Sequence, residues 1–171
     1  MHGPQAYRDA NESDAEALAA LFSETFRETF GHLYSAADLA AFLAEHTADR
    51  WKEQLRDPAF SVRLAEDDCA IGLAKLGPVK LPVEVGLPAL ELRQLYVLQR
   101  VRGSGVAATL MDWAIERARA RGAHELYLSV YTGNARAQRF YRRYGFADVG
   151  PCVFMVGNQA DEDIIMRRSV A

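Results

Sequence analysis

The hydrophobic residues recur partly in short runs and partly in helical steps, which predicts that strands and helices alternate along the chain. A β-favouring segment, Glu91 to Val97, is followed by a polar loop over residues 98–105. A helical repeat then extends to Arg121, with apolar positions at Val106, Ala107, Leu110, Met111, Ala114 and Ala118. Gly122 stands where a left-handed residue commonly ends a helix. This part of the chain is therefore predicted to form a strand, a glycine loop and an amphipathic helix in succession.

The first sixty residues are predicted to form a short strand, over residues 7–10, and then three helices. Ser13 and Glu16 have the spacing of a capping box, which predicts the start of the first helix. Its buried face would carry Ala17, Leu18, Leu21, Phe22 and Phe26. Ser35 starts a second helix, and a third, over residues 49–55, ends before a proline because proline cannot continue a helix.

The segments around the glycine loop have the patterns of further strands. Residues 60–66 and 70–76 are predicted to pair as a hairpin, and residues 77–88 form an irregular insertion with three prolines and two glycines. After the long helix, the chain is predicted to form a strand over 126–130, a short helix over 135–144 and a strand from Phe146. The last two strands would be 152–156 and 164–168, joined by a polar turn over 157–163.

The glycine loop has the composition of a phosphate-binding site. The first N–H groups of a helix have no partners within the helix and carry partial positive charge, which favours a phosphate. A nucleotide P-loop would need a lysine after the glycines, and a dinucleotide fingerprint would need a third glycine where Ala108 stands. We interpret Gly103 and Gly105 as a pyrophosphate cradle, and a surface turn capped by glycines is the alternative.

Two motifs resemble those of the GNAT superfamily of N-acetyltransferases. Arg100-x-x-Gly103-x-Gly105 is similar to its acetyl-CoA signature, Gln/Arg-x-x-Gly-x-Gly/Ala. A second block, Asn134-x-x-Ala137-x-x-Phe140-Tyr141-x-x-x-Gly145-Phe146, follows at the usual distance. The resemblance implies a single GNAT-like domain over residues 1–171, of the α/β (α+β) class. Its mixed, mostly antiparallel sheet would have about seven strands flanked by helices, with the N-terminal helices on the acceptor side.

The same resemblance implies how acetyl-CoA, the cosubstrate, would bind. Backbone groups of Leu95, Tyr96 and Val97, at a strand bulge, would hold the acetyl carbonyl and the pantetheine arm. The phosphates would meet the loop and the helix start, through Arg102, Gly103, Ser104, Gly105, Val106 and Ala107. Asn134 would bond the pantetheine amides as well as cap its helix.

Two residues are candidates for the chemistry of acetyl transfer. Tyr141 would donate a proton to the departing thiolate, and the alternative is an aromatic ring that only packs on the helix. Glu91 stands where many members of the family carry a glutamate base, and burial would raise its pKa. The alternative for Glu91 is a salt bridge with Arg93. Four aromatic residues of the N-terminal half are candidates for the acceptor pocket or for the core: Phe26, Phe30, Tyr34 and Trp51.

Composition narrows the class of protein. Half of the 171 residues are apolar, which is enough for one domain with a core, and no apolar run is long enough to span a bilayer. No signal sequence is evident, so we expect a cytoplasmic enzyme. Cys69 and Cys152 are expected to be reduced, buried thiols. Because the histidines (His2, His32, His46 and His124) are scattered, no metal site is predicted.

Charge is distributed unevenly. Residues 1–95 carry 16 acidic and 9 basic side chains, a balance of −7, whereas residues 96–171 carry 7 and 11, a balance of +4. A basic second half suits an anionic cosubstrate, and an acidic first half would attract a cationic acceptor. Nucleic acid is not an expected partner, because the arginines follow the acetyl-CoA motifs.

The segments 26–35 and 91–97 resemble bacterial polyamine acetyltransferases of the PaiA type, which implies a small-molecule amine such as spermidine or spermine as acceptor. Two alternatives stay open. One is an acetyltransferase acting on peptide N-termini or lysines, and the other is a non-catalytic acyl-CoA-binding module. The resemblance also allows a homodimer, because members of the family are often dimeric.

Overall fold

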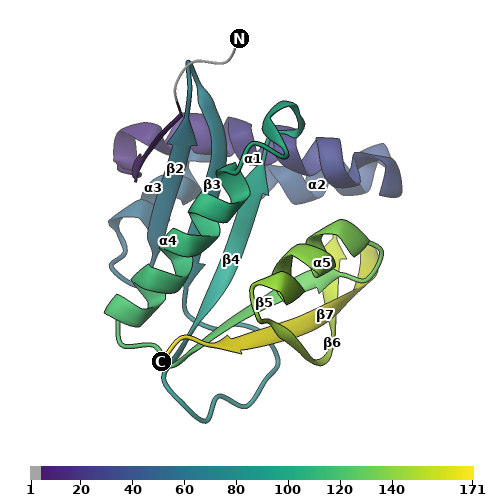
Figure 1. Ribbon diagram of the computed structural model, residues 1–171. Helices are drawn as coiled ribbons and strands as arrows, with labels where there is room; N and C mark the ends of the chain where they lie inside the picture. The colour runs from purple at the N-terminus through teal and green to yellow at the C-terminus, as the bar shows by residue number, and fades with distance from the viewer. Residues whose placement is uncertain (1–4) are drawn as a thin grey trace.

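The computed structural model describes residues 5–171, which form a seven-stranded sheet with helices on both faces (Figure 1). The strand order is β1-β2-β3-β4-β5-β7-β6. All neighbours are antiparallel except β4 and β5, which are parallel. The strands are β1 (Ala6–Asp9), β2 (Ser61–Glu66), β3 (Ala70–Gly77), β4 (Ala89–Val97), β5 (Glu125–Tyr131), β6 (Ala147–Val156) and β7 (Gln159–Ser169). The predicted mixed, mostly antiparallel α/β sheet is confirmed.

Two groups of helices enclose the sheet. The helices are α1 (Ala15–Phe30), α2 (Ala36–Ala44), α3 (Ala48–Arg56), α4 (Val106–Ala120) and α5 (Ala135–Arg143), with short 3-10 turns η1 (Glu12–Asp14), η2 (Gly31–Leu33) and η3 (Gln99–Val101). Helices α4 and α5 lie on one face and α1 to α3 on the other (Figure 1). Within residues 5–171, no helix is both long and apolar enough to cross a membrane.

The predicted apolar stripes form the core where their spacing is helical. Helix α4 buries Val106, Leu110, Met111, Ala114, Ile115 and Ala118, and α1 buries Leu18, Leu21, Phe22 and Phe26. Ala17 is exposed, contrary to prediction, because it lies about 100° around the helix from Leu18. Trp51 of α3 is 2% exposed and packs beneath Lys75, whose Nζ lies 4.6 Å from the ring centroid. It therefore belongs to the core.

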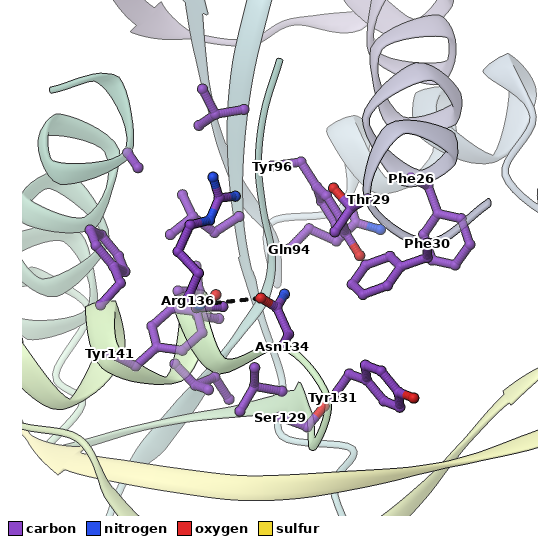
Figure 2. Close-up of a pocket in the computed structure, with 18 of the residues that line it drawn as sticks. Phe26, Thr29, Phe30, Gln94, Tyr96, Ser129, Tyr131, Asn134, Arg136 and Tyr141 are labelled. Carbon is purple, nitrogen blue, oxygen red and sulfur yellow. Dashed lines mark hydrogen bonds between the residues drawn. The ribbon is translucent and has the colours of Figure 1, made fainter. Parts of the chain in front are cut away.

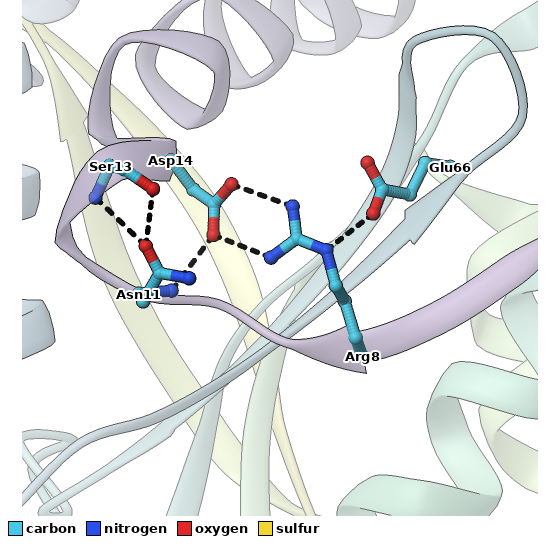
Figure 3. Close-up of polar contacts among 5 residues, drawn as sticks. All are labelled: Arg8, Asn11, Ser13, Asp14 and Glu66. Atoms are coloured by element: carbon cyan, nitrogen blue, oxygen red, sulfur yellow. Dashed lines mark hydrogen bonds and ion pairs between the residues drawn. The ribbon is translucent and has the colours of Figure 1, made fainter.

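The start of α1 is held by residues other than those predicted (Figure 3). Asn11 and Asp14 form the capping box around η1: the Asn11 side chain accepts from the Ser13 N–H, at 3.0 Å, and the Asp14 carboxylate accepts from the Asn11 N–H, at 2.8 Å. Arg8 of β1 donates to both Asp14 oxygens and to Glu66 of β2. The predicted pair, with Ser13 as the cap, is wrong because these contacts from the sheet place the cap two residues earlier.

The predicted hairpin of β2 and β3 is present, but the environment of its cysteine is not as expected. Cys69 lies in the turn and is exposed, so the prediction of a buried thiol is wrong there. Its Sγ accepts a hydrogen bond from Arg100 at 3.3 Å, and the same guanidinium forms an ion pair with Asp67 at 2.8 Å. Cys152, on β6, is partly buried.

The C-terminal hairpin is longer than predicted. Strands β6 and β7 pair from Val156 and Gln159 onwards, so the polar turn shrinks to residues 157–158. Within the segment expected to be a turn, Asp161 and Asp163 are 7% and 6% exposed. The polarity of this segment predicts a turn. The segment is a strand instead, because its backbone pairs with β6 and its carboxylates have partners within the protein.

Candidate active site

The two parallel strands at the centre of the sheet separate along their length. Strands β4 and β5 pair over residues 89–91 and 125–127 and then diverge, while β4 stays paired with β3 and β5 with β7 (Figure 1). A bulge places Arg93 as an extra residue of β4, because Lys75 pairs with Gln94 and Leu76 with Leu92. The bulge was expected at residues 95–97 and lies earlier. Beyond the fork, backbone groups of β4 face an opening instead of a strand.

A cavity of about 540 Å³ occupies this opening, a typical volume for a small-molecule site. Its walls come from both faces of the sheet, with α4 and α5 on one side and α1 on the other (Figure 2). Nine of the predicted site residues line it: Leu95, Tyr96, Val97, Arg102, Gly103, Gly105, Ala107, Asn134 and Tyr141. The segments that carry these predicted residues, 95–97, 102–107 and 134–141, are therefore brought to one cavity.

The N-terminus of α4 lies at this cavity and carries no side-chain cap. Gly105 is the N-cap residue, with φ 90°, a left-handed conformation that favours glycine. A Cβ built there would meet no protein atom within 4 Å. The first N–H groups of α4 are thus free of competition from a side chain, and these are groups that can bind an anion.

Two residues predicted for the cradle lie outside the cavity wall. The Ser104 hydroxyl donates to the Val101 carbonyl and accepts from Gln5 at 3.3 Å. Val106 is 1% exposed and packs in the core, so its backbone N–H alone is placed to serve a ligand.

Guanidinium groups surround the same end of the cavity. Arg102 donates to the Thr29 hydroxyl of α1 at 2.8 Å, and burial and the nearby positive charge of Arg136 lower its pKa. Arg136, Arg139 and Arg143 of α5 also line the cavity. Arg142 instead pairs with Asp148 at 3.2 Å. Cationic groups that repel one another beside a helix N-terminus would be stabilised by a polyanion. The residues present thus fit the diphosphate of acetyl-CoA.

The α5 motif supplies two further groups. Asn134 is the N-cap of α5, its side chain accepting from the Ala137 N–H at 3.2 Å, and its remaining polar atoms face the cavity (Figure 2). Tyr141 packs edge-on against Phe140 and Phe146, with ring centroids 5.6 and 6.0 Å away. Burial raises the pKa of Tyr141 to about 12, so its phenol keeps its proton at neutral pH.

Glu91 lies away from the cavity. Its side chain is buried at the foot of β4, where it accepts from the Lys80 N–H at 2.8 Å and lies 3.5 Å from the Arg93 guanidinium. Burial raises the pKa of Glu91. It is not among the residues that line the cavity. These contacts favour the salt-bridge alternative, and a base role would require a connection through water.

The end of the cavity nearest α1 combines aromatic rings with two carboxylates. Phe26, Phe30 and Tyr34 line it, so the pocket alternative holds for these three, while Trp51 does not line it. Asp161 and Asp163 of β7 are the acidic residues there, and no acidic side chain of residues 5–95 lines the wall. The acidic first half of the chain was expected to attract a cationic acceptor. The carboxylates at this end of the cavity belong instead to the second half of the chain.

Sequence reasoning missed Asp161, Asp163, Gln94 and Arg136 as cavity residues. The signal for the two aspartates was present, because Asp161 and Asp163 are two positions apart and so share a face of a strand. This spacing does not stand out as a strand pattern, because residues 157–163 are mostly polar and predict a turn.

Comparisons with known proteins agree with this geometry. Residues 15–146 match the model of the acetyltransferase (GNAT) family. An uncharacterized N-acetyltransferase of Mycobacterium tuberculosis is 32% identical over 160 residues, covering 92% of this chain and 99% of that protein. An L-methionine sulfoximine/L-methionine sulfone acetyltransferase of Pseudomonas aeruginosa is 28% identical over 146 residues, covering 81% and 78%.

Among solved structures, the PaiA N-acetyltransferase of Thermoplasma acidophilum, in complex with coenzyme A, has the same fold. Its TM-score is 0.79 at 19% identity, over 97% of this chain and 99% of that one. The forked sheet, the uncapped helix and the family match over most of the chain lead to one conclusion: this protein belongs to the GNAT family of acetyl-CoA-dependent N-acetyltransferases.

Proposed function

We propose that the protein acetylates a small, cationic primary amine, with polyamines such as spermidine and spermine as the leading acceptors. The observation that carries this proposal is the pair of buried carboxylates, Asp161 and Asp163, in an otherwise largely aromatic acceptor end of the cavity. A protonated amine would be attracted there by charge and would pack its methylene groups against the rings of Phe26 and Phe30.

The cosubstrate would enter from the opposite end. The N-terminus of α4 and Arg102 would hold its diphosphate, and Asn134 and the free edge of β4, at Leu95 to Val97, would hold the pantetheine arm. The thioester would then lie near Tyr141, which would protonate the departing thiolate. Glu91 remains a candidate base by resemblance to the family.

Amino acids are a second class of acceptor to consider, because one relative is described as acting on methionine sulfoximine. An α-amino acid would bring its own carboxylate towards Asp161 and Asp163, and this repulsion disfavours it. Peptide acceptors are a third class. The insertion that could have shaped a peptide groove, residues 77–88, contributes no residue to the cavity, and its Lys80 N–H instead donates to Glu91.

The test is a panel of acceptors assayed by release of free thiol from acetyl-CoA. We expect turnover with spermidine and spermine, and at least tenfold lower kcat/KM with methionine sulfoximine and with peptides ending in alanine or containing lysine. Activity restricted to the amino acid or to a peptide would reject the polyamine assignment. Tight binding of acetyl-CoA with no turnover on any amine would favour a non-catalytic module.

A further inference from the structure

Asp163 is a buried carboxylate placed at the acceptor end of the cavity. It lies on β7, opposite Tyr131 of β5 and Cys152 of β6, and is 6% exposed. The Ser129 side chain on the neighbouring strand β5 interacts with it as a donor and so lowers its pKa. A carboxylate has room for about four hydrogen bonds, so one donor leaves much of its accepting capacity for a ligand.

The neighbouring Asp161 is held differently. Its Oδ2 accepts from the Tyr34 hydroxyl and its Oδ1 accepts from Gln159 at 3.0 Å, so both oxygens are engaged. Tyr34 itself lies at the end of η2 and lines the cavity. Asp161 is thus held in place by two donors, whereas Asp163 has more of its hydrogen-bonding capacity left for a ligand.

A third group facing the same space lacks a partner. Gln94 of β4 lines the cavity, and its Oε1 is buried without a hydrogen bond to any described residue (Figure 2). Gln94 pairs with Lys75, whose side chain reaches Gln54 of α3, so it points to the α1–α3 face. Asp161 contacts Tyr34 on that face too. A buried amide oxygen without a donor is costly, and a ligand that brings N–H groups would relieve that cost.

We propose that Asp163 is the residue that removes the proton from the acceptor's ammonium group, while Asp161 and Gln94 position that group. The inference rests on the proposed function, an amine acetyltransferase, and adds the base to it. Asp163 lies in the cavity wall at the aromatic acceptor end, and Glu91 lies outside the wall with its carboxylate bound to the insertion.

The proton balance of the step is complete with the groups present. The acceptor enters as R–NH3+, and the Asp163 carboxylate takes one proton, directly or through a water. The neutral nitrogen forms a C–N bond with the thioester carbonyl carbon, and the C–S bond breaks. Tyr141 donates its proton to the sulfur, and the proton lost by the new amide nitrogen returns to the Tyr141 phenolate through solvent. Asp163 then releases its proton to solvent, so one proton is lost for each transfer.

The electrostatic surroundings of Asp163 suit this role. Burial and, to a lesser extent, the charge of Asp161 raise the pKa of Asp163 to about 6, although the Ser129 hydrogen bond lowers it. Tyr131 lies opposite it on β5, and three further titratable groups interact with its charge: Tyr34, Tyr96 and Cys152. Their pKa values are raised, chiefly by burial and partly by the charge of Asp163, so they stay neutral. A base that titrates near 6 is ionised at pH 7 and is stronger than an ordinary aspartate.

The experiment compares D163N with E162Q in the full-length protein, using the best amine from the panel. Glu162 is an exposed acid on the opposite face of β7 and is therefore the matched control. For D163N we expect kcat to fall by at least about 100-fold at pH 7.5, with the affinity for acetyl-CoA, measured by calorimetry, unchanged. The rise of kcat/KM with pH near 6 should disappear. E162Q should stay within about twofold of the unchanged protein.

A second acceptor separates loss of a base from loss of structure. A weakly basic amine such as trifluoroethylamine is largely neutral at pH 7.5, so the penalty of D163N should shrink at least tenfold for it. Full activity of D163N with an unaltered pH profile, or an equal penalty for both amines, would overturn the assignment. So would a complete loss of turnover in E91Q while D163N stays active. Absence of turnover by the unchanged protein with any amine would refute the proposed function, and this inference with it.

Discussion

Replacement of Gly105 by alanine tests whether the start of α4 binds the diphosphate. Gly105 has φ 90°, and a left-handed alanine costs about 1–2 kcal/mol. No protein atom lies within 4 Å of the added Cβ, so the cost to the free protein is conformational. For a chain of 171 residues this corresponds to a fall in Tm of about 2–8 °C.

Binding should suffer more than stability. Because Gly105 lines the cavity, the methyl group would project into the space open to the ligand and hold the diphosphate away from the N–H groups. Loss of one hydrogen bond to a charged group costs about 1.5–3 kcal/mol, which is roughly a tenfold to hundredfold increase in Kd. Calorimetric titration with coenzyme A measures this change directly.

Gly122 provides the matched control at the other end of the same helix. It has φ 84°, and its added Cβ would also meet no atom within 4 Å, but it does not line the cavity. G122A should therefore lose a similar Tm while binding coenzyme A as before. If both substitutions weaken binding equally, or if G105A binds with unchanged affinity, the helix start is not the phosphate site.

Two further substitutions test separate parts of the molecule. Y141F removes the proposed proton donor, so kcat should fall by about 10²-fold or more while the Kd of acetyl-CoA is unchanged; unaltered kcat would leave Tyr141 a packing residue. D14A removes the capping bond to Asn11 and the partner of Arg8, and should lower the free energy of unfolding by about 2 kcal/mol in urea denaturation at pH 7, with turnover unaffected. Because Arg8 lowers the pKa of Asp14, this contribution is present above the unfolded carboxyl pKa of 3.8 and is lost as the pH falls further, so the two proteins should converge in acid. S13A, at an exposed position, should change stability by less than about 0.5 kcal/mol, and a larger loss would restore Ser13 as the cap.

Much of the fold could be predicted because it depends on local chemistry. The burial of Leu110, Met111 and Ala114 follows from helical spacing alone. The cap at Asn134 depends on residues within one turn. The glycine loop before α4 could be interpreted as an anion site because the helix start and its N-cap are neighbours in sequence.

Other features depended on distant partners and could not be read from the chain. Arg8, from β1, and Glu66, from β2, decide that Asn11 and not Ser13 begins the first helical turn. The position of the β4 bulge depends on its register with β3. Cys69 is exposed because the hairpin turn projects from the sheet, which its apolar character does not reveal.

In the candidate site, too, one part could be predicted from the sequence and another part depended on the tertiary structure. The residues that would hold acetyl-CoA lie in two motifs and one strand end, each continuous in sequence. A loop and a helix start can bind a diphosphate with groups a few residues apart. The acceptor end is assembled from β4, β7, α1 and the segment after α1, which are brought together only by the fork in the sheet and the packing of α1 on it. Which of Glu91 and Asp163 lines the cavity depends on the direction in which the sheet points each side chain. That direction is set by pairing between strands far apart in sequence, so tertiary structure alone decided it.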